Sequence, residues 1–263
     1  MWADLQQLPP AAVLILATII GLMVGSFLNV CILRLPAEQS VVSPPSHCPR
    51  CDRGLSWYEN IPVFSWIVLR GRCRGCGEPI SIQYPLIELA TGVIWLISAW
   101  YWGLSLEALR AAVFGTVLLG ILMTDAREYI IPDEFTLGGL AIGLAFALAA
   151  GWHALLTAVI GAAVGFGLLW LVGAAGTWAF KEEAMGGGDI KMMAMVGAFL
   201  GWKGVLLTIF LGALLGSLIF LPLTLAGRKK LVPFGIFLAL GATAAYLAGP
   251  AIFAWYGQYL QGL

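Results

Sequence analysis

Charged residues are scarce in this chain of 263 residues: only 11% are Asp, Glu, Lys or Arg, whereas 60% are hydrophobic. A soluble domain carries roughly 25% charged residues. The composition therefore excludes an ordinary soluble protein and predicts an integral membrane protein with several spans. The formal net charge is zero and no region is basic throughout, so we expect no nucleic-acid partner.

The sequence also lacks the features of a cleavable signal peptide. Its first apolar run, residues 11–33, is longer than the roughly 7–15 residues of a signal-peptide core, and no basic segment precedes it. We therefore interpret this run as a retained span. No glycine-rich nucleotide loop of the Rossmann kind is present either.

Eight apolar segments are candidate membrane helices: residues 11–33, 84–102, 106–124, 135–150, 154–180, 190–200, 205–226 and 231–249. The segment 190–200 is short, because a helix of that length extends only about 16 Å against about 30 Å of hydrocarbon. With eight crossings, every Lys and Arg except Arg110 and Lys203 shares one side, which the positive-inside rule identifies as the cytoplasm. If 190–200 is re-entrant instead, residues 228–230 move outside.

Residues 34–83 form the only polar stretch of any length and hold four of the five cysteines. These cysteines form two Cys-x-x-Cys pairs, Cys48 with Cys51 and Cys73 with Cys76. Four thiolates at such spacings suit a tetrahedral Zn²⁺ ion, which would stabilise a stretch too short for a core of its own. We expect an all-α polytopic membrane protein of about eight helices, organised as a first transmembrane helix (1–33), a cytoplasmic zinc-binding insertion (34–83) and a transmembrane peptidase domain (84–263).

Two aspartates stand at the ends of apolar segments. Asp125 ends the segment 106–124, and Asp189 opens the segment 190–200 directly after Gly186, Gly187 and Gly188. Consecutive glycines allow positive φ angles and close approach of another surface. The expected topology places both acids at the cytoplasmic face. Two carboxyl groups that share a proton can position a water molecule and hydrolyse a peptide bond, so we predict a membrane-embedded aspartic protease.

The helix ends suggest how the two acids divide the work. Asp189 lies at a helix N-terminus, where the macrodipole favours a carboxylate, and Lys191 adds a positive charge nearby. Asp125 lies at a helix C-terminus, which disfavours a carboxylate. We therefore predict that Asp189 is the base that activates water and that Asp125 is the acid. The neighbouring acid Asp133 is interpreted as an interfacial residue.

Two other classes of protein fit part of the pattern. A transporter also uses paired intramembrane acids, but its sites usually lie at the membrane midplane and not at one face. A zinc-stabilised membrane scaffold would explain the cysteines and would leave the glycines before Asp189 without a purpose. Incubation with a peptide that carries a basic leader separates the three, because only a peptidase shortens it.

Several short motifs resemble those of the type IV prepilin peptidases, which are membrane aspartic proteases of the Gly-x-Gly-Asp type. They are Gly-Ser-Phe-Leu-Asn-Val at 25–30, Arg-Leu-Pro at 34–36, Glu-Asn-Ile-Pro at 59–62, Tyr-Pro-Leu-Ile-Glu at 84–88, Asp125 through Pro132-Asp133, Gly186–Asp189 with Lys191, and Pro-Phe-Gly at 233–235. These motifs occur in the family's order and cover nearly the whole chain.

The resemblance implies a bifunctional enzyme of the bacterial inner membrane. Such enzymes cleave the basic leader of prepilins and pseudopilins after a glycine, and then methylate the new N-terminus with S-adenosylmethionine. By resemblance, Asp125 and Asp189 match the catalytic aspartates. The four cysteines match the zinc-type members, and Gly71 matches a glycine implicated in methylation.

Overall fold

The structure is a computed structural model that describes residues 9–182, 184–225 and 233–261. In this part of the chain every regular element is a helix, and the only β-type pairings are two isolated bridges. The chain divides into two compact units, Met1–Thr116 and Val117–Leu263, and the boundary falls within helix α5 (Leu106–Glu128). The expected division at 33/34 and 83/84 stays a prediction.

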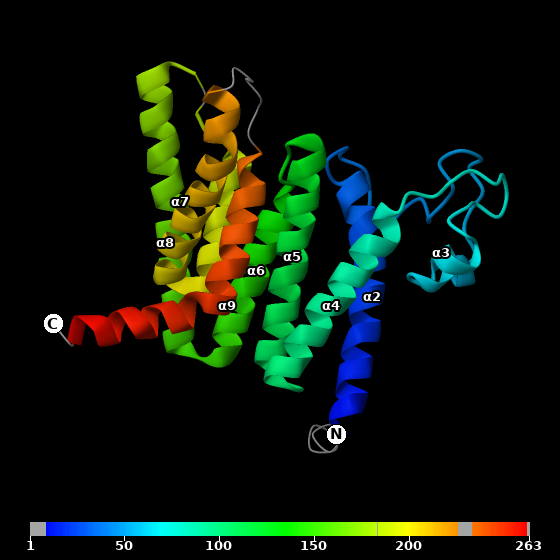
Figure 1. The fold of residues 1–263 in the computed structure, drawn as a ribbon, viewed down its shortest axis with the longest axis horizontal. Coiled ribbons are helices and arrows are strands. Elements are labelled where there is room, and N and C mark those ends of the chain that lie inside the picture. Colours follow the sequence, from blue (N-terminus) through cyan, green and yellow to red (C-terminus); the bar gives the residue numbers. More distant parts are fainter. Residues whose placement is uncertain (1–8, 183, 226–232, 262–263) are drawn as a thin grey trace. The chain divides into compact units, whose positions relative to one another are not determined.

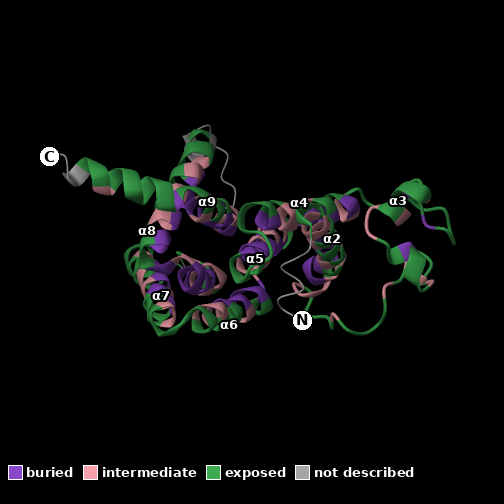
Figure 2. Ribbon diagram, turned by 90° about the horizontal axis from the view of Figure 1, so that it is seen from below, coloured by how far each residue is buried: buried purple, intermediate pink, exposed green. Residues whose placement is uncertain are grey.

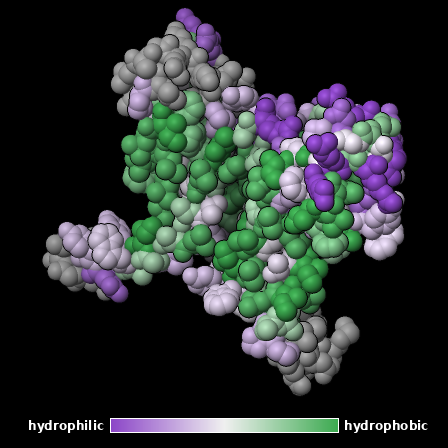
Figure 3. Space-filling view, turned by 45° about the vertical axis from the view of Figure 1, so that its right-hand side comes forward, coloured by the Kyte–Doolittle hydropathy of each residue, from purple (hydrophilic) through white to green (hydrophobic). Residues whose placement is uncertain are grey.

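Seven helices of the described part are long and apolar enough to cross a membrane, which confirms an all-α polytopic membrane protein (Figure 1). They are α2 (Pro10–Arg34), α4 (Gln83–Trp102), α5, α6 (Asp133–Ala150), α7 (Trp152–Phe180), α8 (Gly187–Leu225) and α9 (Phe234–Gln261). Large apolar side chains are exposed along these helices, and hydrophobic residues cover them in Figure 3. Such a surface is suited to lipid.

Helix α8 contains both of the predicted segments 190–200 and 205–226, and it is broken at Gly201, where φ is 67° and ψ is 177°. A Cβ built on Gly165 of α7 would touch both the carbonyl of Met193 and the side chain of Val205. In one straight helix residues 193 and 205 would lie about 18 Å apart along the axis. The chain therefore turns back at Gly201, and counting the two halves of α8 separately gives eight apolar segments.

The first half of α8 is the centre of the second unit. Met192, Met193, Met195 and Val196 have no exposed surface, and Figure 2 shows a helix of mostly buried residues among α6, α7 and α9. Small residues on the surrounding helices make this close packing possible: a Cβ at Gly139 of α6 would come within 2.9 Å of Met195. The reversal at Gly201 returns the chain to the end at which α8 began, and α9 starts after that return.

The first unit is built on α2 and α4, which approach each other through glycines. A Cβ at Gly25 would lie 2.7 Å from the Cα of Glu88, and one at Gly21 would lie 2.7 Å from the Cβ of Trp95. Small residues allow this close contact between membrane helices. Asn29 of α2 donates to the carbonyl of Tyr84 at 3.1 Å, so it joins the two helices.

The insertion between α2 and α4 carries a 3₁₀ helix, η1 (Trp57–Asn60), and one short α-helix, α3 (Phe64–Val68). Hydrophilic residues gather over this insertion in Figure 3. Residues 228–230, three basic residues on which the predicted orientation partly depends, lie outside the described residues.

Candidate active site and metal centre

The second unit brings Asp125 and Asp189 together from two helices. Asp125 lies in the last turn of α5 and is buried, with 5% of its surface exposed, and Asp189 lies in the first turn of α8. Both acids stand beside Ile131, since a Cβ on Gly188, the residue before Asp189, and a Cβ on Gly235, next to Asp125 Oδ2, would each contact its side chain. The prediction that these two acids share one end of the helices agrees with this arrangement.

A third helix end completes the surroundings of Asp125. The N–H of Ile236, in the first turn of α9, donates to Asp125 Oδ2 at 2.9 Å, and the N–H of Gly235 gives a further hydrogen bond. The first N–H groups of a helix have no partner within it and are well suited to bind an anion. The carboxyl group of Asp125 therefore caps α9, although it stands at the C-terminal end of its own helix.

Asp189 lacks comparable partners. Its Oδ1 atom is buried and has no hydrogen-bond partner among the described residues. A buried carboxylate oxygen without a donor is costly, whereas a protonated carboxyl group there is much less so. The two acids of the site therefore have unequal surroundings.

Ile131, in the loop between α5 and α6, lies between the first turn of α8 and the first turn of α9. A Cβ at Gly188 would come 2.9 Å from the Cβ of Ile131, and one at Gly235 would come 2.7 Å from its Cδ1. Gly235 also approaches the active-site acid, since the same Cβ would lie 2.9 Å from Asp125 Oδ2. Glycine at both positions is what allows α8 and α9 to close around the loop.

The glycines before Asp189 behave differently from the expectation. None of Gly186, Gly187 and Gly188 has a positive φ, so their conformational freedom is not used in that way. Only Gly188 makes the expected close approach, because a Cβ at Gly187 would meet no atom within 4 Å and one at Gly186 would meet only Asp189 Oδ2 at 3.5 Å. Of the three glycines, only Gly188 is required by packing, and Gly186 and Gly187 have room for a methyl group.

Lys191 binds Asp133. Its ammonium group donates to both carboxylate oxygens of Asp133, at 2.7 and 2.8 Å, and joins the first turns of α8 and α6. The sequence predicts that Lys191 supplies positive charge beside Asp189. In the structure Lys191 is paired instead with Asp133, the first residue of α6. Sequence reasoning missed this partner, and it assigned no role to Gly235 or Ile236, because the contacts join residues that are far apart in the chain.

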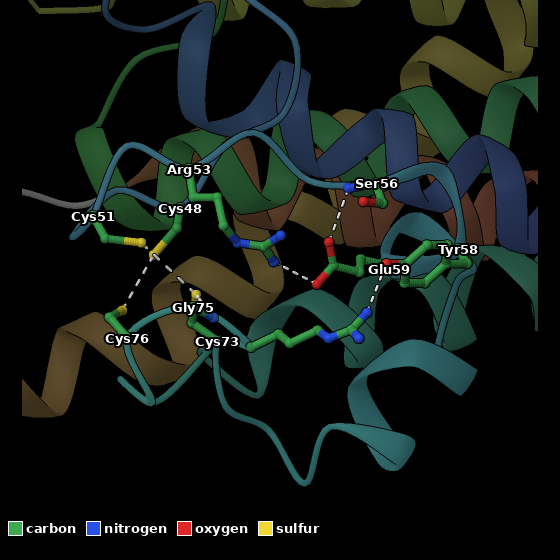
Figure 4. Close-up of polar contacts among 10 residues, drawn as sticks. Cys48, Cys51, Arg53, Ser56, Tyr58, Glu59, Cys73, Gly75 and Cys76 are labelled. Atoms are coloured by element: carbon green, nitrogen blue, oxygen red, sulfur yellow. Dashed lines mark hydrogen bonds and ion pairs between the residues drawn. The ribbon is translucent and has the colours of Figure 1, made fainter.

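The first unit holds the four cysteines at one point. All four sulfur atoms lie within 4.8 Å of one another, with Cys48 and Cys76 3.9 Å apart and Cys51 and Cys73 4.0 Å apart (Figure 4). Four sulfurs placed about 2.3 Å from a tetrahedral zinc ion would be separated by about 3.8 Å. The donor set and its spacing therefore fit Zn²⁺ closely.

Two loops of the same design present these cysteines. In each loop the first cysteine N–H donates to a carbonyl five residues on, from Cys48 to Arg53 and from Cys73 to Glu78, at 3.0 and 2.8 Å. Burial and the neighbouring thiols raise the pKa of the Cys76 thiol to about 11, whereas the N–H groups of Cys76 and Gly75 lower the pKa of the Cys73 thiol to about 6. A thiolate at neutral pH is the form that binds a metal.

An ion pair ties the first loop to η1. Arg53 donates to Glu59 at 2.5 Å, and Glu59 also accepts the N–H of Ser56 at 2.9 Å (Figure 4). The Ser56 N–H and the Arg53 guanidinium together hold the pKa of Glu59 below its ordinary value. Glu59 therefore organises the cysteine region without contributing a ligand.

Gly71 has a conformational role in the structure. Its φ is 65°, and a Cβ would lie 2.8 Å from the ring of Trp66. Its N–H and C=O bond Trp66 and Ile80 across the turn that leads into the second cysteine loop. Any link between Gly71 and methylation stays a prediction.

Comparison with known proteins identifies the family. Residues 19–102 match the model described as the bacterial Peptidase A24 N-terminal domain, and residues 112–221 match the type IV leader peptidase family. The chain belongs to the type IV leader peptidase family, which confirms the resemblance seen in its motifs. No solved structure matches it.

Relatives named prepilin leader peptidase/N-methyltransferase are similar over much of the chain. The one from Pseudomonas putida is 35% identical, covering 97% of this chain and 96% of its own length. The one from Aeromonas hydrophila is 37% identical over 92% of each chain. The one from Myxococcus xanthus (strain DK1622) is 42% identical over 79% of this chain, which spans 62% of that relative's length.

Proposed function

We propose that this protein is a membrane-embedded aspartic endopeptidase that removes the basic leader of type IV prepilins or pseudopilins after a glycine. The observation that carries the proposal is that Asp125 and Asp189, two acids from different helices, both lie beside Ile131 at one end of the second unit. The names of the relatives supply the substrate class. A pair of carboxyl groups that shares one proton is the machinery this hydrolysis needs.

The surroundings of the two acids support a division of roles opposite to the one expected from their own helices. Hydrogen bonds from α9 stabilise a carboxylate on Asp125, whereas the unpartnered oxygen of Asp189 favours its protonated form. Asp125 then takes a proton from water as that water attacks the scissile carbonyl carbon. Asp189 donates its proton to the carbonyl oxygen. As the tetrahedral intermediate breaks down, Asp125 gives its newly acquired proton to the leaving amine, and Asp189 recovers a proton from the hydroxyl group whose oxygen becomes the carbonyl of the new carboxyl group.

The depth of the site suits this substrate. A pilin leader is basic and water-soluble, and the mature chain begins as an apolar helix in the bilayer. The scissile bond would lie at the membrane interface, where the two acids stand at helix ends. We place the protein in the bacterial inner membrane with this end in the cytoplasm, since most Lys and Arg residues fall on that side of the expected topology.

The second proposed activity is N-methylation of the new N-terminus. It would use S-adenosylmethionine, which the relatives' N-methyltransferase name suggests. The described residues form no glycine-rich nucleotide loop. Glycine at position 71 is explained by its positive φ and by the Trp66 ring beside it, so no step of the reaction is assigned to this methyl donor. Zn²⁺ bound by the four cysteines would serve as a structural ion that holds the two loops together.

Leader cleavage by purified protein tests the proposal. Asp125→Asn and Asp189→Asn should each abolish cleavage of a full-length prepilin, whereas the matched change Asp133→Asn should reduce it less than tenfold. Substantial cleavage by either dyad variant would exclude the assignment. A transporter or a scaffold would leave the prepilin intact in every case, the wild type included.

Infrared spectroscopy tests the division of roles separately. The protonated-carboxyl band at working pH should disappear in Asp189→Asn and persist in Asp125→Asn. The reverse result would restore Asp189 as the base. The pair titrates as a unit, so rate profiles alone cannot make this distinction.

A further inference from the structure

The short helix α3 exposes apolar residues that the rest of the insertion does not cover. Phe64, Ile67 and Val68 are 62%, 60% and 61% exposed. Residues spaced by three and four positions lie on one face of a helix. The other side of α3 is attached to the fold, because the Trp66 ring packs against Gly71 and donates to the carbonyl of Ile80 at 3.1 Å.

A part-buried hydrogen bond fixes how deep α3 lies. Glu88 of α4 accepts the N–H of Val63, the residue directly before α3, at 2.7 Å, and Ser26 of α2 also bonds this carboxyl group. Glu88 stands five residues, or about 7.5 Å, inside the start of α4. Ser26 stands eight residues, or about 12 Å, before the end of α2.

The length of α4 relates the positions of Glu88 and Ser26 to the hydrocarbon layer of the bilayer. Its 20 residues extend about 30 Å, which is the thickness of the hydrocarbon layer. The start of α3 is therefore anchored beside the outer turns of the membrane-spanning part and not in water beyond it. Figure 1 agrees, since α3 lies below the ends of α2 and α4 to which the insertion is joined.

Three arginines follow α3 in the chain. Arg70, Arg72 and Arg74 come directly after α3 and are exposed. Trp57, 80% exposed, also belongs to this region. Arginines and tryptophan beside a short apolar segment are the residues that anchor a protein at an anionic lipid surface.

We propose that α3 is a membrane-anchoring helix whose face Phe64, Ile67 and Val68 inserts among the lipids of the same bilayer that α2 and α4 cross. Arg70 and Arg72 bind anionic headgroups beside it, while Arg74 donates to the Tyr58 hydroxyl at 2.6 Å. The insertion is thus held against the bilayer, and the cysteine loops lie at headgroup level. This proposal refines the expectation of a cytoplasmic insertion between residues 34 and 83.

Photocrosslinking from a benzophenone amino acid at Ile67 tests this contact. The full-length protein is placed in liposomes of phosphatidylethanolamine and phosphatidylglycerol, and adducts are identified by mass spectrometry. Ile15, 61% exposed on α2, is the lipid-facing control, and the exposed Glu78 is the water-facing control. We expect lipid adducts at Ile67 with a yield close to that at Ile15, and almost none at Glu78.

Two outcomes would overturn the proposal. One is the absence of lipid adducts at Ile67 when Ile15 is labelled, and the other is adducts only to protein, either this chain or an added prepilin. A second change, Val68→Asp, should reduce the lipid adduct at Ile67 several-fold, because a carboxylate inserts poorly. An unchanged yield in that variant would also contradict lipid insertion, and an unchanged melting temperature confirms that the variant is folded.

Discussion

Adding a single methyl group at Gly235 should damage catalysis while the fold survives. The new Cβ of Gly235→Ala would lie 2.9 Å from Asp125 Oδ2 and 2.7 Å from Ile131 Cδ1. Ordinary van der Waals contact needs about 3.4–4 Å, so the neighbours must move by about 0.5–1 Å. Both atoms end flexible side chains and can move, and one of them belongs to the proposed catalytic base.

The expected loss follows from that displacement. Misplacing a catalytic group by about 1 Å costs about 10²-fold in rate, or about 2.7 kcal/mol of transition-state stabilisation. Gly188→Ala should also be impaired, because its Cβ meets the Cβ of Ile131, which is close to the backbone and moves less easily. Gly187→Ala is the matched control, since the added methyl meets no atom within 4 Å.

Initial rates of prepilin cleavage by the three purified variants, together with their melting temperatures, provide the measurement. The rate should stay within about twofold of wild type for Gly187→Ala and fall about a hundredfold for Gly235→Ala. Wild-type cleavage by Gly235→Ala would refute the close approach of α9 to Asp125. A large loss in Gly187→Ala would show that the glycine motif acts in some way other than the packing described.

The remaining predictions concern the supporting residues. Lys191→Met and Asp133→Asn should each reduce cleavage less than tenfold. Each should shift the free energy of unfolding by about 1 kcal/mol or less, since the ion pair is exposed. The loss of stability in the double variant should not exceed the sum of the losses in the two single variants. Cys73→Ser should lower the metal content from about one zinc per chain, by elemental analysis, and should impair methylation more than cleavage. Glu59 has a lowered pKa, so its stabilising effect is complete above the ordinary glutamate pKa and is lost as pH falls through the lowered value. The melting temperatures of wild type and Glu59→Gln should therefore converge on acidification, and a constant difference would contradict the role of its charge.

Local patterns in the sequence predicted much of this architecture. Apolar runs located the helices, and the spacing of Cys48, Cys51, Cys73 and Cys76 predicted a metal centre. The alternation of crossings placed Asp125 and Asp189 at the same end. Each of these inferences depends on composition or on residues close together in the chain.

Contacts between distant segments were beyond that reasoning. The macrodipole of its own helix disfavours a carboxylate on Asp125, and nothing near Asp125 in the sequence indicates that the first turn of α9 donates to it. Lys191 stands two residues from Asp189 in the chain, yet the fold pairs it with Asp133. The depth of α3 likewise depends on Glu88, an acid whose partner comes from the insertion and not from its own helix.

The hydrogen bonds from α9 to Asp125 also bear on biosynthesis. In chain order α9 follows every other element of the second unit, and its first turn supplies the N–H groups that favour a carboxylate on Asp125. During translation, α5 and both halves of α8 emerge before these donors exist. The two acids can meet in a nascent chain, but the charge distribution of the finished site arises only when α9 inserts. The proposed proteolytic site is therefore complete only once the last helix of this unit is in place.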